Sequence, residues 1–166
     1  MGKETEIIKS QLIDAFPNLS YDADFKITSN ESSDYNCIAW AYKYYEDRIM
    51  WPGGQDCKTL DGFHYWPEGI ENLVDENNPD VSAFIEAFQK EGFNICYSDT
   101  HEDNYERIAL YVNSGTTICT HASREKRNGK WTSKLGPKQD IQHGSPYSLE
   151  GDNYGKVFCI MKRLFL

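Results

Sequence analysis

Hydrophobic positions near the N-terminus repeat with the period of a helix. The apolar residues that share one face of this pattern are Ile7, Ile8, Leu12, Ile13 and Phe16. Pro17 ends the pattern, which predicts a helix with a polar lead-in over residues 1–30. A second helix is predicted over 34–47, because the polar residues 32–34 can cap an apolar run that carries Cys37 in its first turn.

Residues 48–78 show no regular period and form a long loop with Trp-Pro pairs at Trp51 and Trp66. Loops of this length in compact domains are often functional. We therefore expect the two indole rings to line a cleft; the alternative is that they plug the core. A third helix is predicted over 79–91, with Asn78 as its cap and Gly92 at its end.

After Gly92 the hydrophobic period changes to that of strands. Runs typical of strands occur at 93–98, 107–113, 116–123 and 128–135 and near the C-terminus, with turn sequences between them. Helices that precede antiparallel strands are the pattern of an α+β fold. We expect a single domain over 1–166, in which N-terminal helices pack on a small antiparallel sheet formed by 93–165.

The charge of the chain limits the choice of partners. Its 166 residues include 17 basic and 26 acidic ones, which gives a formal net charge of −9. A protein that binds a phosphate backbone needs a basic surface, so the charge argues against a nucleic-acid partner and against an anionic membrane. An amide- or peptide-type substrate, or a basic protein partner, fits this charge better.

Neither the N-terminus nor the cysteines indicate a special compartment. No stretch approaches the roughly 18 apolar residues of a membrane-spanning helix, and the first residues lack the apolar core of a secretory signal. We expect a cytoplasmic protein, although an effector delivered by a specialised secretion system needs no such signal. The five cysteines include no CxxC pair, so we expect no disulfide framework, no metal and no cofactor.

Cys37 and His121 are the residues with the clearest chemical interest. A cysteine in the first turn of a helix lies near free N–H groups that stabilise a thiolate. His121 lies in a predicted strand and supplies a base, and Asp140 or His143 could orient its ring. Asn36 and the backbone N–H groups at the helix start could stabilise an oxyanion.

Each of these residues also has a plainer interpretation. Most free cysteines only pack in a core, which is our expectation for the other four cysteines. Cys119 precedes His121 by two positions on one strand, so the two should share a face, and Cys119 is an alternative thiol. Trp131 and Lys134 follow on the next strand; Lys134 could bind a substrate carboxylate, or be a solvated residue at a sheet edge.

Four segments carry a resemblance: "YNCIAWA" (35–41), "THASR" (120–124), "GKWTSKLGPKQDIQH" (129–143) and "LEGDNYGKV" (149–157). In this order they resemble an uncharacterised bacterial domain family over about residues 35 to 162. The order of elements is more distantly similar to papain-like folds of the NlpC/P60 and CHAP type. That similarity implies a helix cysteine that attacks an acyl carbon and a strand histidine that acts as base. The chain departs from it at Tyr105–Arg107, where NlpC/P60 domains usually carry the base.

Two functions of different class follow. The first is a cysteine-dependent hydrolase or acyltransferase that acts on an amide-type bond through Cys37 and His121, with Trp51, Trp66 and Trp131 around the substrate. The same chemistry would serve a delivered effector. The second is a non-enzymatic acidic binding module, of the immunity or inhibitor type, on a papain-like scaffold.

Overall fold

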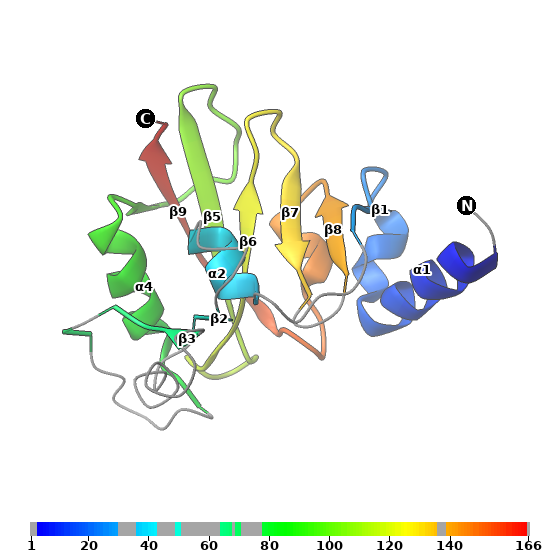
Figure 1. The fold of residues 1–166 in the computed structure, drawn as a ribbon, viewed down its shortest axis with the longest axis horizontal. Helices are drawn as coiled ribbons and strands as arrows, with labels where there is room; N and C mark the ends of the chain where they lie inside the picture. Colours follow the sequence, from blue (N-terminus) through cyan, green and yellow to red (C-terminus); the bar gives the residue numbers. More distant parts are fainter. Residues whose placement is uncertain are drawn as a thin grey trace.

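A computed structural model describes residues 3–29, 36–42, 49–50, 64–67, 69–70, 78–135 and 139–165. A seven-stranded sheet dominates it, with the strand order β1-β8-β7-β6-β5-β9-β4 and antiparallel pairing throughout (Figure 1). Its strands are β1 (Lys26–Ile27), β4 (Asn94–Cys96), β5 (Tyr105–Val112), β6 (Cys119–Glu125), β7 (Trp131–Lys134), β8 (Asp140–His143) and β9 (Lys156–Leu164). A separate parallel pair joins β2 (Ile49–Met50) to β3 (His64–Tyr65).

The helices are short and lie against both faces of this sheet. They are α1 (Lys3–Ala15), α2 (Cys37–Tyr42) and α4 (Val81–Lys90), with 3-10 turns η1 (Pro17–Tyr21) and η2 (Pro146–Leu149). Among the described residues, no helix has both the length and the apolar character needed to cross a bilayer.

One apolar layer lies between α2, α4 and the sheet, which we call the α2–α4 layer. It contains Phe84 and Phe88 of α4 and alternate residues of β5, namely Ile108, Leu110 and Val112. Because strand side chains alternate between faces, the odd-numbered neighbours in β5 must point to the other side. Helix α4 begins at a cap formed by Asp80, whose carboxylate accepts from the Ser82 N–H at 3.1 Å, and not by the predicted Asn78.

The second layer lies between the opposite face, α1 and η1, and we call it the α1 layer. Ala109 and Tyr111 of β5 meet Trp131 and Ile141 there, together with Leu12 of α1. Leu12 and Phe16 of the predicted apolar stripe are buried in this layer, and Ile8 and Ile13 pack partly against it. Ile7 is 57% exposed, so only part of the predicted stripe faces a core.

The expected fold, in which N-terminal helices pack on a small antiparallel sheet as in papain-like proteins, is wrong. The sheet has seven strands where a small one was expected, and the short helices do not gather into an N-terminal layer on it. Two of the strands, β1 and β8, come from polar segments without a strand-like pattern, and both attach to the edge of the predicted sheet beside β7. The difference therefore comes from strand pairing between distant segments, which local periodicity does not report.

Two β-bulges flank β5 at the same level. On the β6 side, Tyr111 pairs with His121 and Val112 with Cys119, so Thr120 is an extra residue. On the β9 side, Leu110 pairs with Cys159 and Tyr111 with Val157, so Phe158 is extra. A bulge shifts the alternation of side chains by one position. Cys119 therefore joins the α2–α4 layer while His121 points to the other face, which corrects the expectation that they share one.

Gly155 provides a test of the close approach between the turn before β9 and the end of β5. Its φ is +76°, and a Cβ there would lie 1.9 Å from the Val112 carbonyl oxygen. Gly115 has nearly the same φ, +78°, with no atom within 4 Å of such a Cβ. We expect Gly115→Ala to lower the free energy of unfolding by about 1 kcal/mol, since only the backbone is strained.

Gly155→Ala should lower the free energy of unfolding by about 2 kcal/mol more than Gly115→Ala does, because the steric clash with Val112 adds to the same backbone strain. Urea denaturation of both variants measures the difference. Equal losses would contradict the close contact between Gly155 and Val112.

Candidate functional site

Cys37 is the first residue of α2 and lies almost completely buried in the α2–α4 layer, with 6% of its surface exposed. Asn36 caps this helix, since its side-chain oxygen accepts from the Ala39 N–H at 3.0 Å. Burial raises the pKa of the Cys37 thiol to about 11. The N–H groups of Ala122, Ile38 and Cys37 itself, and the charge of Lys134, lower this pKa by less. The helix start does favour a thiolate, as predicted, but desolvation outweighs it.

His121 is fully buried on the other face of the sheet, in the α1 layer. Its ring stacks on Tyr154 with centroids 4.0 Å apart and planes 5° from parallel, and it also contacts Tyr111. Its Nε2 lies 3.0 Å from the Ser133 Oγ, which lies 2.9 Å from the Nε2 of His143. Hydrogen bonds thus connect three strands, β6, β7 and β8.

The donor and acceptor of each of these hydrogen bonds follow from the contact between His143 and Ser145. The Ser145 carbonyl oxygen can only accept, so the His143 Nδ1, 2.8 Å away, must carry the proton. His143 Nε2 is then an acceptor, and Ser133 donates its hydroxyl proton to it. Ser133 in turn accepts from His121, whose proton therefore lies on Nε2.

Both histidines in this relay are neutral. Burial lowers the pKa of His121 well below its usual value and that of His143 to about 4. The Nδ1 of His121 is left as a bare acceptor, buried and without a hydrogen-bond partner among the described residues. A neutral imidazole with one free lone pair can accept a proton, which is the property that the sequence assigned to His121.

The predicted pair of Cys37 and His121 does not form in this structure. The thiol belongs to the α2–α4 layer and the imidazole to the α1 layer, and no hydrogen bond joins them. They approach the same stretch of β6, however, because the N–H that faces Cys37 belongs to Ala122, the residue after His121.

Of the predicted orienting residues, His143 acts on His121 through Ser133, and Asp140 lies elsewhere, opposite Lys134 in the ladder of β7 and β8. Ser133 was not among the predicted site residues. Its contact with His121 depends on the β6–β7 register, which the sequence did not define.

Lys134, Trp131 and Trp66 are buried in the protein interior. Lys134 is fully buried and is not a solvated edge residue; its charge acts on Cys37. Trp131 is buried in the α1 layer. Trp66 plugs the core, as the plainer interpretation proposed: its indole N–H donates to the Ile70 carbonyl oxygen at 3.2 Å, and its ring meets Phe84 edge to face. Trp51 lies outside the described residues.

Sequence reasoning also missed a groove beside β4, at the end of the sheet. The groove, which we call the β4 groove, has a volume of about 340 Å³. The large exposed side chains along it are Ile95, Tyr97, Tyr147 and Phe158, with exposed fractions of 42%, 98%, 44% and 45%. Phe158 is the extra residue of the bulge in β9. The alternating run at 93–98 was a signal for this face, but Tyr147 and Phe158 reach it only through the fold.

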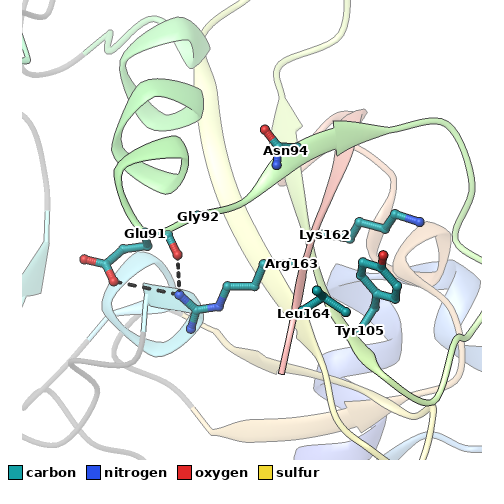
Figure 2. A pocket seen from close by; sticks show the side chains of 7 residues that line it. All are labelled: Glu91, Gly92, Asn94, Tyr105, Lys162, Arg163 and Leu164. Atoms are coloured by element: carbon teal, nitrogen blue, oxygen red, sulfur yellow. Dashed lines mark hydrogen bonds and ion pairs between the residues drawn. The ribbon is translucent and has the colours of Figure 1, made fainter. Parts of the chain in front are cut away.

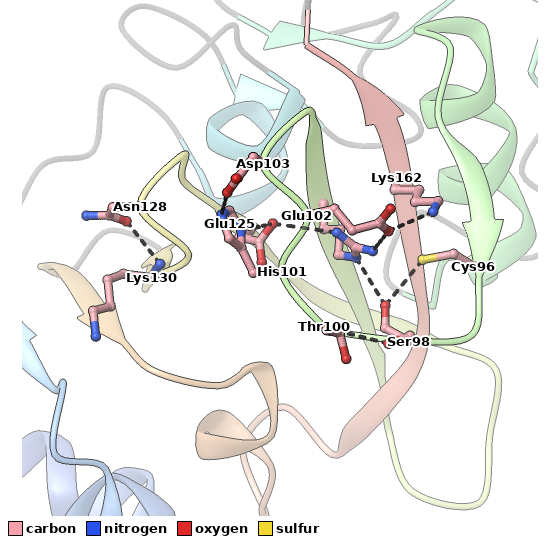
Figure 3. Close-up of polar contacts among 11 residues, drawn as sticks. Cys96, Ser98, Thr100, His101, Glu102, Asp103, Glu125, Asn128, Lys130 and Lys162 are labelled. Atoms are coloured by element: carbon pink, nitrogen blue, oxygen red, sulfur yellow. Dashed lines mark hydrogen bonds and ion pairs between the residues drawn. The ribbon is translucent and has the colours of Figure 1, made fainter.

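A buried polar network holds the segment that forms one wall of this groove (Figure 3). The Ser98 carbonyl oxygen accepts from the Arg107 Nε at 3.1 Å and from the Cys96 thiol at 3.4 Å. Arg107 is itself buried and pairs with Glu102, and its guanidinium lies 3.9 Å from Glu125. These contacts hold the segment around Ser98 in place.

A second groove, of about 440 Å³, lies toward the far end of β9, between Asn94, Tyr105 and Leu164 (Figure 2). It carries two cationic side chains that already have partners. Lys162 pairs with Glu102 at 2.8 Å, and Arg163 pairs with Glu106 and donates to the Glu91 carbonyl oxygen. These pairs leave little free charge for a ligand.

Within the part of the chain that the structure describes, no group of three or more His, Cys, Asp or Glu side chains could hold a metal ion. Residues 26–162 match the model of a family described as "Domain of unknown function (DUF7689)". No curated protein and no solved structure matches the chain.

The reactivity of Cys37 tests its environment. At neutral pH we expect iodoacetamide to label Cys37 at least about 100 times more slowly than an ordinary thiol of pKa about 8.5. The reason is that only a small fraction of the Cys37 side chain is in the thiolate form. Half-buried Cys96 serves as the internal reference, and peptide mass spectrometry gives both rates. His121→Ala should not change the rate at Cys37. Rapid labelling of Cys37 that His121→Ala abolishes would contradict this description.

The two neutral histidines should make stability depend on pH. Their pKa values are lower in the folded than in the unfolded protein, so the unfolded state binds more protons between about pH 6.5 and about pH 4. Stability should fall as the pH falls through this window, by roughly 3 kcal/mol from His143 alone.

The double variant His121→Gln/His143→Gln should show a flatter dependence, whatever its stability at pH 7. The raised pKa of Glu125, caused chiefly by burial, acts in the opposite direction but is common to both proteins. Urea denaturation at several pH values measures the slopes, and identical slopes would rule out buried neutral histidines.

Proposed function

This chain belongs to the DUF7689 family, whose description assigns no activity, and we propose from its own surface that it is a protein-binding module. The observation that carries the proposal is the exposed aromatic surface of the β4 groove. The acidic character of the chain, at −9, is the second support.

Exposed rings in a groove are typical of interaction sites. Single exposed apolar residues are common on any surface, but here four large ones line one groove. Tyrosine is among the residues that contribute most to binding energy, since its ring gives contact area at a small entropic cost. Tyr97 has 98% of its surface exposed, and it is the residue that a partner would bury most.

The position of the groove suits protein recognition. β4 has a single neighbour, β9, among the described strands of the sheet, and an extended segment of a partner could pair with its other edge. The wall formed by Ser98 is already held by Arg107 and Cys96, which lowers the entropy lost on binding.

A thiol-dependent acyl transfer is the second candidate function. Two observations favour it: backbone N–H groups of α2 and β6 face the Cys37 sulfur, and His121 retains a bare Nδ1. In this reaction the Nδ1 would take the thiol proton as Cys37 attacks an amide carbon, and later return it to the leaving amine. The candidate requires a rearrangement that brings the two groups together, and the labelling experiment with His121→Ala discriminates it from the first.

Selection from a random peptide library displayed on phage tests the binding proposal. We expect the protein to enrich peptides whose affinity falls about tenfold or more with Tyr97→Ser or Phe158→Ser, since both changes remove an aromatic anchor. Tyr21→Ser is the matched control, because Tyr21 is 89% exposed and is not among the residues that line the groove.

Cys37→Ser should retain the binding in full. If no peptide is enriched, or if the enriched peptides bind the Tyr97→Ser and Phe158→Ser variants as well as the unchanged protein, the β4 groove is not a binding site.

A further inference from the structure

We infer that the β4 groove binds a segment of a partner protein through an arginine or lysine side chain, which lies against the exposed rings and pairs with Asp99. The inference rests on the proposed function and adds the chemistry of the partner to it. Asp99, the groove's aromatic rings and the overall charge carry the inference.

Asp99 is a carboxylate that pairs with no cation among the described residues. It lines the groove and is partly exposed, and it forms no ion pair in the part of the chain that the structure describes. Other acids of this region are already used: Glu102 pairs with Arg107 and Lys162. Asp99 therefore has a charge available for a ligand.

A second carboxylate, Glu150, lies near Tyr147, which lines the groove. The negative charges of Asp99 and Glu150 both reach the Tyr147 hydroxyl, whose pKa burial raises and these charges raise further. Glu150 has a structural task as well, since one of its oxygens accepts from the Val157 N–H at 2.9 Å. The local field at Tyr147 is thus negative, which favours a cation.

The rings themselves favour a cation with an apolar stem. An arginine or lysine side chain can lay its methylene groups along Tyr97 and Phe158 and place its charge over a ring face. The molecule already uses such contacts elsewhere: the Lys162 ammonium lies 4.3 Å from the ring centre of Tyr105, and Arg163 lies 4.5 Å from that of Phe93.

Charge decides between a basic partner and a second copy of this chain. Two copies would each bring a formal charge of −9, and their Asp99 carboxylates would meet across the shared groove. The second groove, beside Lys162 and Arg163, is a poorer site for a charged ligand because both cations are paired. A basic segment in the β4 groove satisfies Asp99 without such repulsion.

Two phage libraries test the inference: a random peptide library and a matched one that lacks arginine and lysine codons. We expect at least about tenfold stronger enrichment from the first, with arginine or lysine in the selected peptides. In a synthetic selected peptide, arginine or lysine replaced by glutamine should weaken the affinity about tenfold, measured by fluorescence anisotropy. Asp99→Asn should remove most of this difference, whereas Asp14→Asn, which removes the same charge from exposed α1, should not.

The outcomes separate this inference from the proposed function. If both libraries yield peptides of equal affinity that Tyr97→Ser releases, the groove is a binding site but its preference for a cation is overturned. If Asp14→Asn acts as strongly as Asp99→Asn, the attraction comes from net charge alone, and the role of Asp99 is overturned. If neither library yields a peptide that depends on Tyr97, the proposed function fails first.

Discussion

The two bulges beside β5 determine the orientation of the side chains on which any function depends. In β6 the extra residue Thr120 changes the alternation, so that Cys119 and His121 lie on opposite faces. The Thr120 hydroxyl donates to the Tyr154 carbonyl oxygen at 2.6 Å, and Tyr154 in turn stacks on the His121 ring. In β9 the extra residue is Phe158, which is 45% exposed in the β4 groove. At the level of the two bulges, the His121 imidazole in β6 is therefore buried, whereas the Phe158 ring in β9 is partly exposed to solvent.

Burial favours the neutral forms of Cys37, His121 and His143, the most reactive residue types of the chain. His121 and His143 each satisfy one nitrogen through Ser133, a neutral arrangement that a low-dielectric interior favours. Cys37 lies among N–H groups that would stabilise its thiolate, but the same interior keeps the proton on the sulfur. The β4 groove has the opposite character, since its large side chains and Asp99 are partly or fully exposed to water.

Local patterns in the sequence predicted the elements well and their assembly poorly. The first helix, the α4 helix with Gly92 at its end, and strands β5, β6, β7 and β9 follow from periodicity and turn residues, because these signals act within a few positions. The shared face of Trp131 and Leu135 was also predictable from alternation within one strand. β1 and β8 were not, since their short polar sequences become strands only through pairing with each other and with β7. The placement of Cys37 and His121 in different layers was not predictable for a similar reason. A single inserted residue in a strand has no signature in the hydrophobic pattern, yet it exchanges the two faces.

The buried pair of Arg107 and Glu125 has a consequence for how this protein can diverge. Both side chains are 1% exposed, 3.9 Å apart, and located below the segment that carries Tyr97 and Asp99. Replacing Arg107 first would leave the Glu125 carboxylate in the interior with His101 as its remaining neighbour of opposite charge, and only when that ring is protonated. Replacing Glu125 first leaves Arg107 paired with Glu102 and still bonded to the Ser98 carbonyl oxygen. Descendants of this chain can therefore lose Glu125 more readily than Arg107. Sequences that keep Arg107 would keep the segment bonded to it in place, while the exposed residues of that segment remain free to adapt to a different partner.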